Sequence, residues 1–369
     1  MRVSRREIVR GLAAAAALAA AGAPAMAQAP TKLRVGVLRL SSSGPVFIAQ
    51  ERGHFREAGI DIDFKYFDAA QPIAVAIASG DLDVGVTALT AGLFNLANKG
   101  AIRVVAGQSR EAAGFPLIGY LATKAAYEAG LKTPKDLAGR TIGMTQVGSS
   151  FHYSMGLLAR KYGFDLSKTR LVPLQSMSNV ASAVKGGRVD AALLPATAAQ
   201  PLIDSGDAKL LGWVGDETPW QLGGVFAGPS FIEKNRDAMV RFLGAYQKGA
   251  RDYHDILLKP QKEGVTPLDD ATRPVLAMIA KHVEQPPEKV AVGLAYVEPN
   301  AVLSIESVDD QIAFMQGEKL STPASRRPRS STRASATRSS PRYSMTIRGA
   351  ARAPAPPASC ICTPRAMST

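Results

Sequence analysis

The chain has 369 residues, 46% of them hydrophobic, which is enough for two domains with sizeable cores. Its formal net charge of +13 comes almost entirely from the two ends, because residues 1–27 contribute +3 and residues 321–369 contribute +9. The body between them carries only +1, and such a nearly neutral body excludes a basic surface for nucleic acid.

Residues 1–27 have the pattern of an export signal. Residues 4–10 resemble the twin-arginine motif, and the ten apolar residues at 12–21 are too few to span a bilayer, which needs about 20. An Ala-Met-Ala sequence ending at Ala27 fits a signal-peptidase site. We therefore expect a signal peptide cleaved after Ala27 and a mature protein in the periplasm; the alternative is an Ala-rich amphipathic helix of the mature chain.

The mature body begins with alternating strand and helix patterns. Residues 32–40 alternate as a strand, and a Ser-Gly-Pro turn at Ser43 then starts a helix that is predicted to end at Gly59. Regular alternation of this kind indicates a parallel sheet with helices on both faces. The other elements expected in this first unit are strands at 60–67, 82–87 and 102–106 and helices that end at Gly80 and Gly100.

The same order of elements returns in the second part of the chain. Residues 76–91 match residues 183–198, 107 positions later, with five identities that include Asp83 and Asp190. The chain therefore looks like two copies of one βαβαβ unit, in which these aspartates are interpreted as structural turn residues. The second copy is predicted to have strands at 141–145, 171–174 and 189–194 and helices that end at Gly163 and Gly186.

Two further apolar segments, at residues 115–122 and 222–227, are predicted to pass between the copies. The first has no obvious helix after it, and the second is followed by helical patterns up to about Gly317, the longest at 233–258, which we expect on the outside of the first lobe. We thus expect two lobes of parallel-rich sheet with flanking helices, joined by a two-crossing hinge. Their expected extents are 31–117 plus 225–317 for lobe 1 and 118–224 for lobe 2.

The tail at residues 321–369 has a different composition. It is rich in Ser, Arg, Pro, Ala and Thr and has no Asp, Glu or Lys, so it cannot bury enough apolar surface to fold. It is interpreted either as a disordered basic arm that touches nucleic acid or anionic lipid, or as the product of a reading-frame shift near Gly317. The abrupt change favours the second. Cys360 and Cys362 lie here and are assigned neither a disulfide nor a metal role.

Loops rich in small polar residues follow the predicted strands. In open parallel sheets the ligand crevice lies beyond the carboxyl ends of the strands, so two duplicated units would present two such sets of loops to one shared pocket. The candidate ligand-binding residues are Ser42, Ser43, Asp68, Gln71, Thr87, Ala88, Thr90, Gly148, Ser149, Ser150, His152, Ser176, Asn179, Pro195 and Trp213.

Several of these residues have two interpretations. Ser43 and Ser149 precede helices, so they either form an anion site with the positive ends of the helix dipoles or only cap the helices. His152 either donates to a carboxylate or sulfonate, or stacks on a ring, or is structural. Trp213 either walls the pocket or packs in the core. Asp68 either binds an amine or caps a helix.

The sequence has no recognisable catalytic motif. It lacks a P-loop, a CxxC pair, an HExxH helix and a G-x-S-x-G elbow, and its histidines at 54, 152, 254 and 282 are too dispersed for a metal site. We therefore expect no catalytic residue, no metal and no cofactor. An exported binder of a small solute is the simplest class that remains.

A series of residues occurs in a characteristic order: Gly44, Pro45, Gly53, Phe55, Gly59, Gly80, Asp81, Asp83, Gly139, Arg140, Ile142, Gly143, Gly148, Ser149, Gly187, Val189, Asp190 and Pro195. This order resembles the solute-binding proteins of nitrate, sulfonate and taurine ABC importers, a group that also contains the binders of thiamine-pyrimidine precursors. The resemblance covers roughly residues 33–315. It implies a type II periplasmic-binding fold, capture of a small solute between lobes, and delivery to a membrane permease and its ATPase by what we expect to be a monomer.

The resemblance leaves the ligand open. A small organic anion such as a sulfonate, nitrate or a carboxylate is one expectation, and a neutral aromatic or pyrimidine-type thiamine precursor is the alternative. Some members of the wider group are enzymes that use a cysteine-rich motif, which this body lacks. An effector-sensing domain of a regulator has the same fold, but it would need a DNA-binding helix-turn-helix where the export signal stands.

Overall fold

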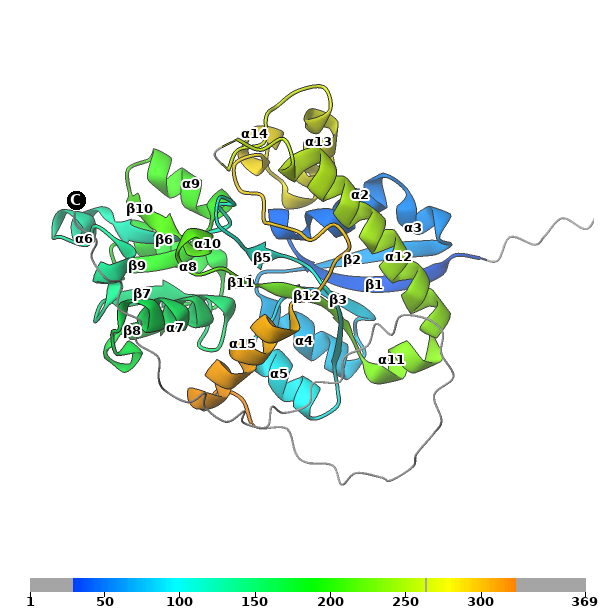
Figure 1. Ribbon diagram of the computed structural model, residues 1–369, viewed down its shortest axis with the longest axis horizontal. Coiled ribbons are helices and arrows are strands. Elements are labelled where there is room, and N and C mark those ends of the chain that lie inside the picture. Colours follow the sequence, from blue (N-terminus) through cyan, green and yellow to red (C-terminus); the bar gives the residue numbers. More distant parts are fainter. Residues whose placement is uncertain (1–28, 263, 323–369) are drawn as a thin grey trace, which may run out of the picture.

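The computed structural model of the chain describes residues 29–262 and 264–322 (Figure 1). The predicted signal peptide and the predicted tail beyond Thr322 lie outside these residues. Within the described ranges, no helix is long and apolar enough to cross a membrane. The architecture is mixed α/β, with two five-stranded sheets that each carry flanking helices.

The first sheet is built from β1 (Thr31–Leu38), β2 (Ile60–Phe67), β3 (Val84–Ala88), β4 (Arg103–Gly107) and β12 (Gly223–Ala227). Its strand order is β2-β1-β3-β12-β4. Strand β1 pairs in parallel with β2 and β3, whereas β12 is inserted antiparallel between β3 and β4. The one antiparallel strand of this sheet therefore comes from much later in the chain.

The second sheet repeats this plan with β6 (Ile118–Thr123), β7 (Thr141–Met144), β8 (Arg170–Pro173), β9 (Ala191–Pro195) and β10 (Ala208–Trp213). Its strand order is β10-β6-β9-β7-β8. Strand β7 pairs in parallel with β8 and β9, and β6 is inserted antiparallel between β9 and β10. Each sheet thus receives its antiparallel strand where the chain passes between the sheets.

The duplicated aspartates have the same role in both sheets. Asp83 Oδ2 accepts a hydrogen bond from the backbone N–H of Arg34 at 2.8 Å, and Asp190 Oδ2 accepts one from the backbone N–H of Thr141 at 2.8 Å. In both pairs the two residues are 49 positions apart. Each aspartate ties the start of the third strand of its unit to the first strand, which is the structural role that the sequence suggested.

Helices cover both sheets (Figure 1). Those of the first unit are α2 (Gly44–Glu51), α3 (His54–Glu57), α4 (Ala70–Ser79) and α5 (Ala91–Asn98). Those of the second unit are α6 (Lys124–Glu128), α7 (Ser150–Tyr162), α8 (Met177–Lys185), α9 (Ala196–Asp204) and α10 (Val214–Glu217). The C-terminal helices are α11 (Pro229–Lys234), α12 (Arg236–Asp252), α13 (Thr272–Val283), α14 (Pro287–Val290) and α15 (Ile305–Gly317). Short 3-10 turns occur at Ser41–Ser43, Pro134–Leu137 and Leu166–Lys168.

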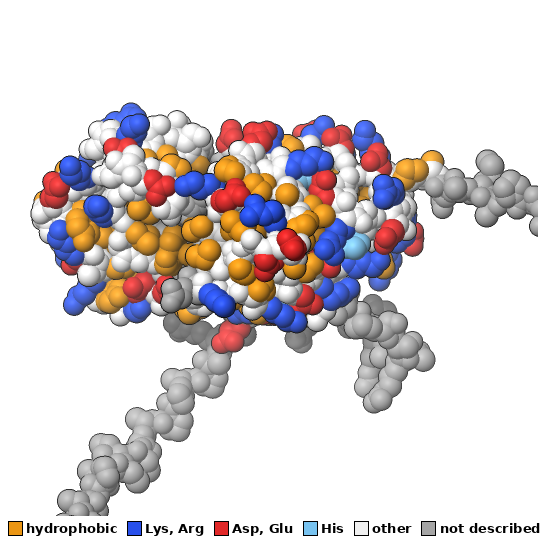
Figure 2. Space-filling view, turned by 90° about the horizontal axis from the view of Figure 1, so that it is seen from above, with side chains coloured by type: hydrophobic (Ala, Val, Ile, Leu, Met, Phe, Trp, Pro, Cys, Tyr) orange, Lys and Arg blue, Asp and Glu red, His pale blue; other side chains and the backbone are white. Residues whose placement is uncertain are grey.

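We call the first sheet with α2–α5 and α11–α14 the first half, and the second sheet with α6–α10 the second half. Both halves contribute to one large apolar cluster, in which Phe94 of α5 and Phe151 of α7 are fully buried. On the face drawn in Figure 2, Lys and Arg side chains are interspersed with Asp and Glu. This mixed surface agrees with the nearly neutral charge of the body.

Several elements differ from the sequence predictions. The backbone of Gly53 has a φ of 78°, a left-handed conformation, so the helix predicted to run to Gly59 is divided into α2 and α3. Strand β6 is followed at once by α6, which has only five residues and therefore a weak pattern. Helix α9 contains Pro201, which hides its helical pattern, and β10 follows it. The long helix expected at 233–258 begins at Arg236, and its last turn is a π-helix at Tyr253–Leu258.

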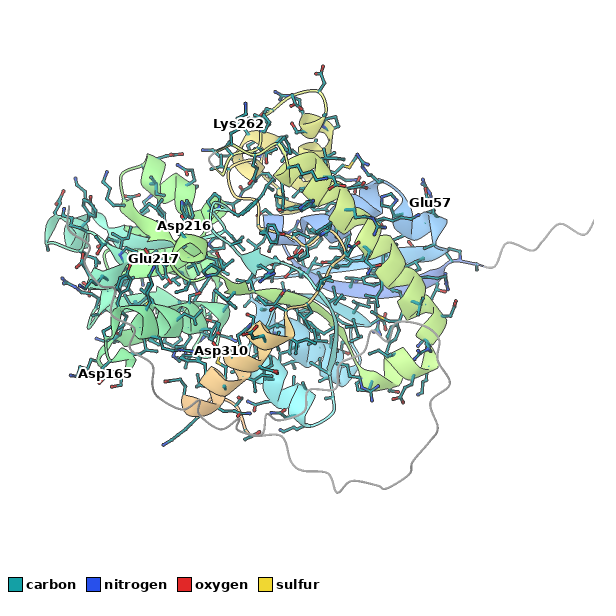
Figure 3. The ribbon with its side chains drawn as sticks, viewed as in Figure 1. Glu57, Asp165, Asp216, Glu217, Lys262 and Asp310 are labelled. Carbon is teal, nitrogen blue, oxygen red and sulfur yellow. The ribbon has the colours of Figure 1, made fainter. Side chains whose placement is uncertain are left out.

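The last helix, α15, does not cover only the first half. Helices α12 and α13 pack on α2, as expected, but α15 lies against both α5 and α7. Asp310 on α15 accepts hydrogen bonds from Tyr153 and Arg160 of α7 (Figure 3). The ring of Phe314 lies so close to Gly156 that a Cβ there would be 2.1 Å from it. Helix α15 therefore bridges the two halves.

Ser321 and Thr322 belong to the fold and not to the tail to which the sequence assigned them. Ser321 is buried, and the backbone N–H of Thr322 donates to Asn95 Oδ1 at 2.9 Å. Asn98 Nδ2 donates to the carbonyl of Thr322 at 2.5 Å. Polar side chains of α5 thus fix this end of the described chain, and a tail boundary at residue 321 is too early.

A separate two-stranded antiparallel ribbon connects the halves. It consists of β5 (Arg110–Glu111) and β11 (Trp220–Gln221), which lie directly before the two strands that enter the sheets antiparallel. The carboxyl group of Glu111 is fully buried, and its burial raises its pKa well above the ordinary value. The neutral form of this side chain is therefore favoured in the ribbon.

Candidate functional site

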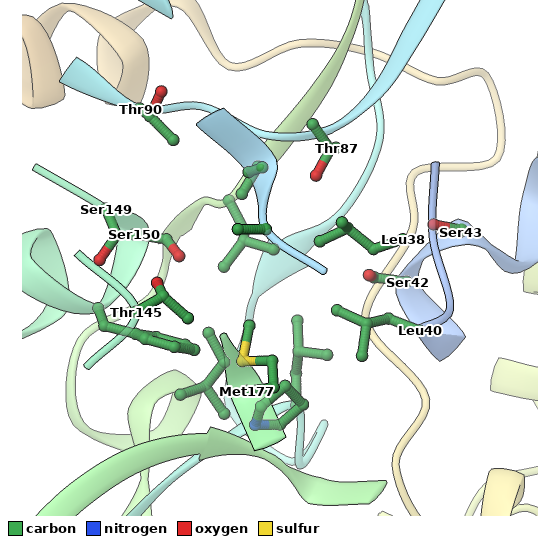
Figure 4. Close-up of a pocket in the computed structure, with 18 of the residues that line it drawn as sticks. Leu38, Leu40, Ser42, Ser43, Thr87, Thr90, Thr145, Ser149, Ser150 and Met177 are labelled. Atoms are coloured by element: carbon green, nitrogen blue, oxygen red, sulfur yellow. The ribbon is translucent and has the colours of Figure 1, made fainter. Parts of the chain in front are cut away.

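A pocket that encloses about 40 Å³ lies between the two halves (Figure 4). The carboxyl ends of the parallel strands β1, β3, β7 and β9 lead into it, which is the position of ligand crevices in open parallel sheets. Its lining residues are Leu38, Leu40, Ser42, Ser43, Ala69, Ala70, Thr87, Ala88, Thr90, Leu117, Ile118, Thr145, Gln146, Ser149, Ser150, Phe151, Met177, Pro195 and Leu222.

The structure brings about half of the predicted site residues to this pocket. Those that line it are Ser42, Ser43, Thr87, Ala88, Thr90, Ser149, Ser150 and Pro195. Those that do not are Asp68, Gln71, Gly148, His152, Ser176, Asn179 and Trp213.

Most of the residues outside the lining have structural roles. Ser176 caps α8 by accepting from the backbone N–H of Asn179 at 3.1 Å, and the Asn179 side chain donates to the carbonyl of Leu174. Gln71 accepts from the Thr90 hydroxyl at 2.6 Å. Trp213 packs over Gly119 of the neighbouring strand β6. These contacts explain why polar or aromatic residues occur at these positions without reaching the pocket.

Asp68 neither reaches the pocket nor caps a helix. Its side chain is exposed, and the N-cap of α4 is the next residue, Ala69, which offers no side-chain hydrogen bond. The capping role considered from the sequence is therefore wrong for this residue, and its side chain lies outside the pocket lining.

His152 is a structural histidine next to the pocket. It is 4% exposed, its Nδ1 accepts from the backbone N–H of Gly148 at 3.1 Å, and its ring meets the edge of Phe314. Burial lowers the pKa of His152 to about 4, so the imidazole is neutral near pH 7. It holds the loop in front of α7 and does not carry a positive charge to a ligand.

The sequence prediction missed the apolar part of the lining. It considered loops with small polar residues, whereas Leu38, Leu117, Ile118 and Leu222 belong to strands or strand ends and Met177 opens helix α8. A signal was present for Met177, because it stands between Ser176 and Asn179, which were both predicted to bind the ligand. Thr145 and Gln146 were also missed. They follow the carboxyl end of β7, just as the predicted site residue Ser42 follows the carboxyl end of β1.

Three hydroxyl groups of the lining are buried without a hydrogen-bond partner among the described residues: those of Ser43, Thr87 and Ser149. Their residues are 1%, 1% and 5% exposed. Buried polar groups in native proteins nearly always have a partner, so each of these hydroxyls requires an explanation. Figure 4 shows that these three residues lie on different sides of the pocket. Ser43 lies on the side where β1 ends, Ser149 lies on the opposite side, and Thr87 lies between them.

Ser43 and Ser149 stand at helix N-termini but do not cap them. Ser43 is the N-cap residue of α2 and Ser149 that of α7, and neither side chain accepts a hydrogen bond from its own helix. In contrast, Thr90 accepts from the backbone N–H of Leu93 at 3.1 Å and so caps α5. Of the two interpretations of these serines, simple capping is wrong.

Comparison with known proteins identifies the family. Residues 41–262, more than half of the chain, match the family described as NMT1/THI5 like. The chain belongs to the NMT1/THI5-like family. This chain is similar to the "Taurine-binding periplasmic protein" of Escherichia coli (strain K12). The two are 27% identical over 246 residues, which cover 64% of this chain and 72% of the relative.

Solved structures establish the fold of this NMT1/THI5-like protein. The alkanesulfonate-binding protein SsuA from Xanthomonas axonopodis pv. citri, bound to MOPS, is 20% identical and superimposes with a TM-score of 0.62 over 80% of this chain and 96% of its own. The nitrate-binding protein NrtA from Synechocystis PCC 6803 is 12% identical, with a TM-score of 0.55 over 71% of this chain and 69% of its own. The type II periplasmic-binding fold and the family resemblance inferred from the sequence are confirmed.

The pocket of this NMT1/THI5-like protein is neutral. None of its lining residues is a Lys, Arg, His, Asp or Glu of the described chain. Within the described residues there is also no group of three or more His, Cys, Asp or Glu side chains that could hold a metal ion. The pocket can therefore recognise a solute through hydroxyl groups, the Gln146 amide, helix dipoles and apolar contact.

The two halves of the protein touch at the edge of the pocket. The backbone N–H at the start of α5, on Ala91, donates to the carbonyl of Gly148 in the second half at 2.9 Å. Gly148 has a φ of 81°, and a Cβ on it would be 2.8 Å from the Cβ of Ala91. This approach requires glycine, and it holds the α7 loop against the first half.

Proposed function

We propose that this protein is the periplasmic solute-binding component of an ABC importer and that it captures a small organic anion between two lobes. The observation that carries this proposal is the set of buried, unpartnered hydroxyls of Ser43, Thr87 and Ser149 around one pocket. The names of the relatives, a taurine-binding periplasmic protein and an alkanesulfonate-binding protein, support an anionic solute and a periplasmic location. Delivery to a membrane permease with its ATPase follows from this role.

In this proposal the lobes are residues 31–117 plus 225–317 and residues 118–224. The anion accepts hydrogen bonds from Ser43 and Thr87 of lobe 1 and from Ser149 of lobe 2, where the positive ends of the dipoles of α2 and α7 add to its stabilisation. No cation is needed, because a helix N-terminus and neutral donors are sufficient to bind an anion.

Binding and closure are then coupled. A solute in the open form contacts one lobe, and it gains the hydrogen bonds of the other lobe only when the hinge closes, so it shifts the population toward the closed form. A shift from 1:99 to 99:1 requires about 5.5 kcal/mol of differential binding. Hydrogen bonds to a charged group contribute roughly 1.5–3 kcal/mol each, so the Thr145, Ser149 and Ser150 side of the pocket is sufficient.

The proposal is tested with the mature chain, freed of bound solute by partial unfolding and refolding. We expect a saturable rise in melting temperature with sulfonates, nitrate or carboxylates, and calorimetry should show that Ser149→Ala weakens this binding by about 10- to 100-fold. The matched control is Ser176→Ala, which removes a serine of the same half that caps α8 outside the pocket. Equal affinities of the two variants would argue against the proposed site.

A neutral ligand is the second candidate, because no charged side chain of the described residues lines the pocket. A pyrimidine has ring nitrogens that accept hydrogen bonds from hydroxyls, and its ring would pack on the apolar lining. Saturable stabilisation by pyrimidines, with no response to any anion in the same screen, would replace the anion proposal by this one.

A further inference from the structure

The lining of the pocket is divided between hydroxyl groups and apolar side chains. Its polar part consists mainly of serines and threonines, and the rest is apolar and includes Leu40, Leu117, Phe151 and Met177. In the view of Figure 4, Met177 lies on the side of the pocket opposite Thr87 and Thr90. A solute that satisfies the hydroxyl groups must therefore place the remainder of its body against carbon.

The described lining contains no carboxylate that could pair with an ammonium group. The acid that follows strand β2, Asp68, is exposed and does not reach the pocket, and the neighbouring residues that do so are Ala69 and Ala70. An ammonium group enclosed here would be a buried charge without a counter-charge, which is strongly unfavourable. Neutral acceptors such as the Gln146 amide do not compensate for the loss of hydration of a full charge.

From these observations we infer that the solute is an alkyl sulfonate or carboxylate without an amino group, and that the pocket rejects zwitterions such as taurine. The inference rests on the proposed anion-binding function and makes it narrower. It also separates this chain from its relative that is named for taurine, with which it shares 27% identity.

Two pairs of ligands that differ mainly in an amino group test the inference by calorimetry on the mature chain. Ethanesulfonate is compared with taurine, which is 2-aminoethanesulfonate, and propanoate is compared with β-alanine. We expect the amine-free member of at least one pair to bind about 100-fold more tightly than its amino partner. Equal or tighter binding of taurine would overturn the inference and leave the anion-binding proposal in place. Failure of all four ligands, nitrate and longer sulfonates to bind would overturn both.

A substitution at Met177 that adds a carboxylate to the pocket tests the inference independently, because it should allow the pocket to accept an amino group. Met177 is half-buried, lines the pocket and is the first residue of α8, where an acidic side chain is favourable to the helix. Met177→Glu supplies the missing counter-charge, so the ratio of taurine to ethanesulfonate affinity should rise by about 10-fold or more. Met177→Gln has the same shape without the charge and should leave this ratio near that of the unmodified protein. An unchanged ratio in Met177→Glu would contradict the inference.

Discussion

Four helices around the pocket have a serine or threonine as the N-cap residue directly before them, and these four residues fall into two pairs. Thr90 and Ser176 accept hydrogen bonds from the first turns of α5 and α8, and we call them the capping residues. Ser43 and Ser149 precede α2 and α7 without bonding to them, and we call them the pocket serines. One member of each pair comes from each half of the molecule.

The difference between the pairs follows from the loops in front of the helices. In the second half, His152 accepts the N–H of Gly148 and so fixes the loop that carries Ser149. In the first half, Gln108 Nε2 donates to the carbonyl of Ser42 at 3.0 Å and fixes the loop before α2. Since other side chains hold these loops, the pocket serines are not needed for that purpose, and their hydroxyl groups are left for a solute.

The largest effect is expected from acid. Protonation of His152 would remove the Nδ1 acceptor that holds the Ser149 loop. The pKa of His152 is lowered to about 4 in the folded state, below its ordinary value of 6.5. Between these two pH values the unfolded chain binds a proton that the folded protein does not, so stability falls as the pH falls from about 6.5 to about 4. The loss expected from this residue is roughly 3 kcal/mol.

Urea unfolding of the unmodified protein and of His152→Gln, at several pH values between 4 and 8, measures this effect. The variant keeps a neutral side chain at every pH, so the difference in unfolding free energy between the two proteins should change by roughly 3 kcal/mol over this range. Using the difference cancels the contributions of other titrating groups such as His282 and Glu111. A difference that is independent of pH would show that His152 titrates normally.

The next largest effect is expected from the contact that holds the Ser149 loop against α5 of the first half. Gly148→Ala places a Cβ against Ala91 of the other half and puts an alanine in a left-handed conformation. Gly163→Ala is the matched control, because Gly163 has a φ of 71° and a Cβ on it would meet nothing within 4 Å. Gly163→Ala should lose about 1 kcal/mol of stability, and Gly148→Ala should lose more because its Cβ also meets Ala91; only Gly148→Ala should weaken solute binding, by roughly 10-fold or more. Similar affinities of the two variants would indicate that closure does not depend on this contact.

Much of the fold could be predicted from the sequence because its signals are local and occur twice. The glycine at the end of α4 and the aspartate before β3 recur as Gly187 and Asp190 before β9, and they located the strands that form the pocket. The bridging position of α15 could not be predicted. It depends on contacts such as those of Asp310 with Arg160, which are 150 positions apart and leave no periodic pattern.

The pocket could be predicted only in part, for a physical reason. The sequence shows which residue can cap a helix, but whether its hydroxyl does so depends on small differences in backbone geometry at that turn. Ser176 and Ser149 both precede a helix with φ and ψ in the extended region, yet only Ser176 bonds to its helix. For the same reason the sequence could not decide whether His152 binds a ligand or is structural. Its hydrogen bond from the Gly148 N–H is seen only in the structure.

The smallest expected effect compares the capping residue Ser176 directly with the two pocket serines. Their removal should change the unfolding free energy in different directions. Ser176→Ala removes a helix cap and should lower the unfolding free energy by about 1 kcal/mol. Ser43→Ala and Ser149→Ala remove buried hydroxyls that have no partner among the described residues, so in the solute-free protein they should leave stability unchanged or raise it by up to about 1 kcal/mol. Urea unfolding of the three variants at pH 7.5, with and without the solute, measures both signs. With solute present, Ser43→Ala and Ser149→Ala should be the less stable variants. The serines then make hydrogen bonds to the solute that the alanines lack, whereas Ser176→Ala keeps these bonds. A loss at Ser149→Ala equal to that at Ser176→Ala in the solute-free protein would mean that Ser149 caps α7 after all.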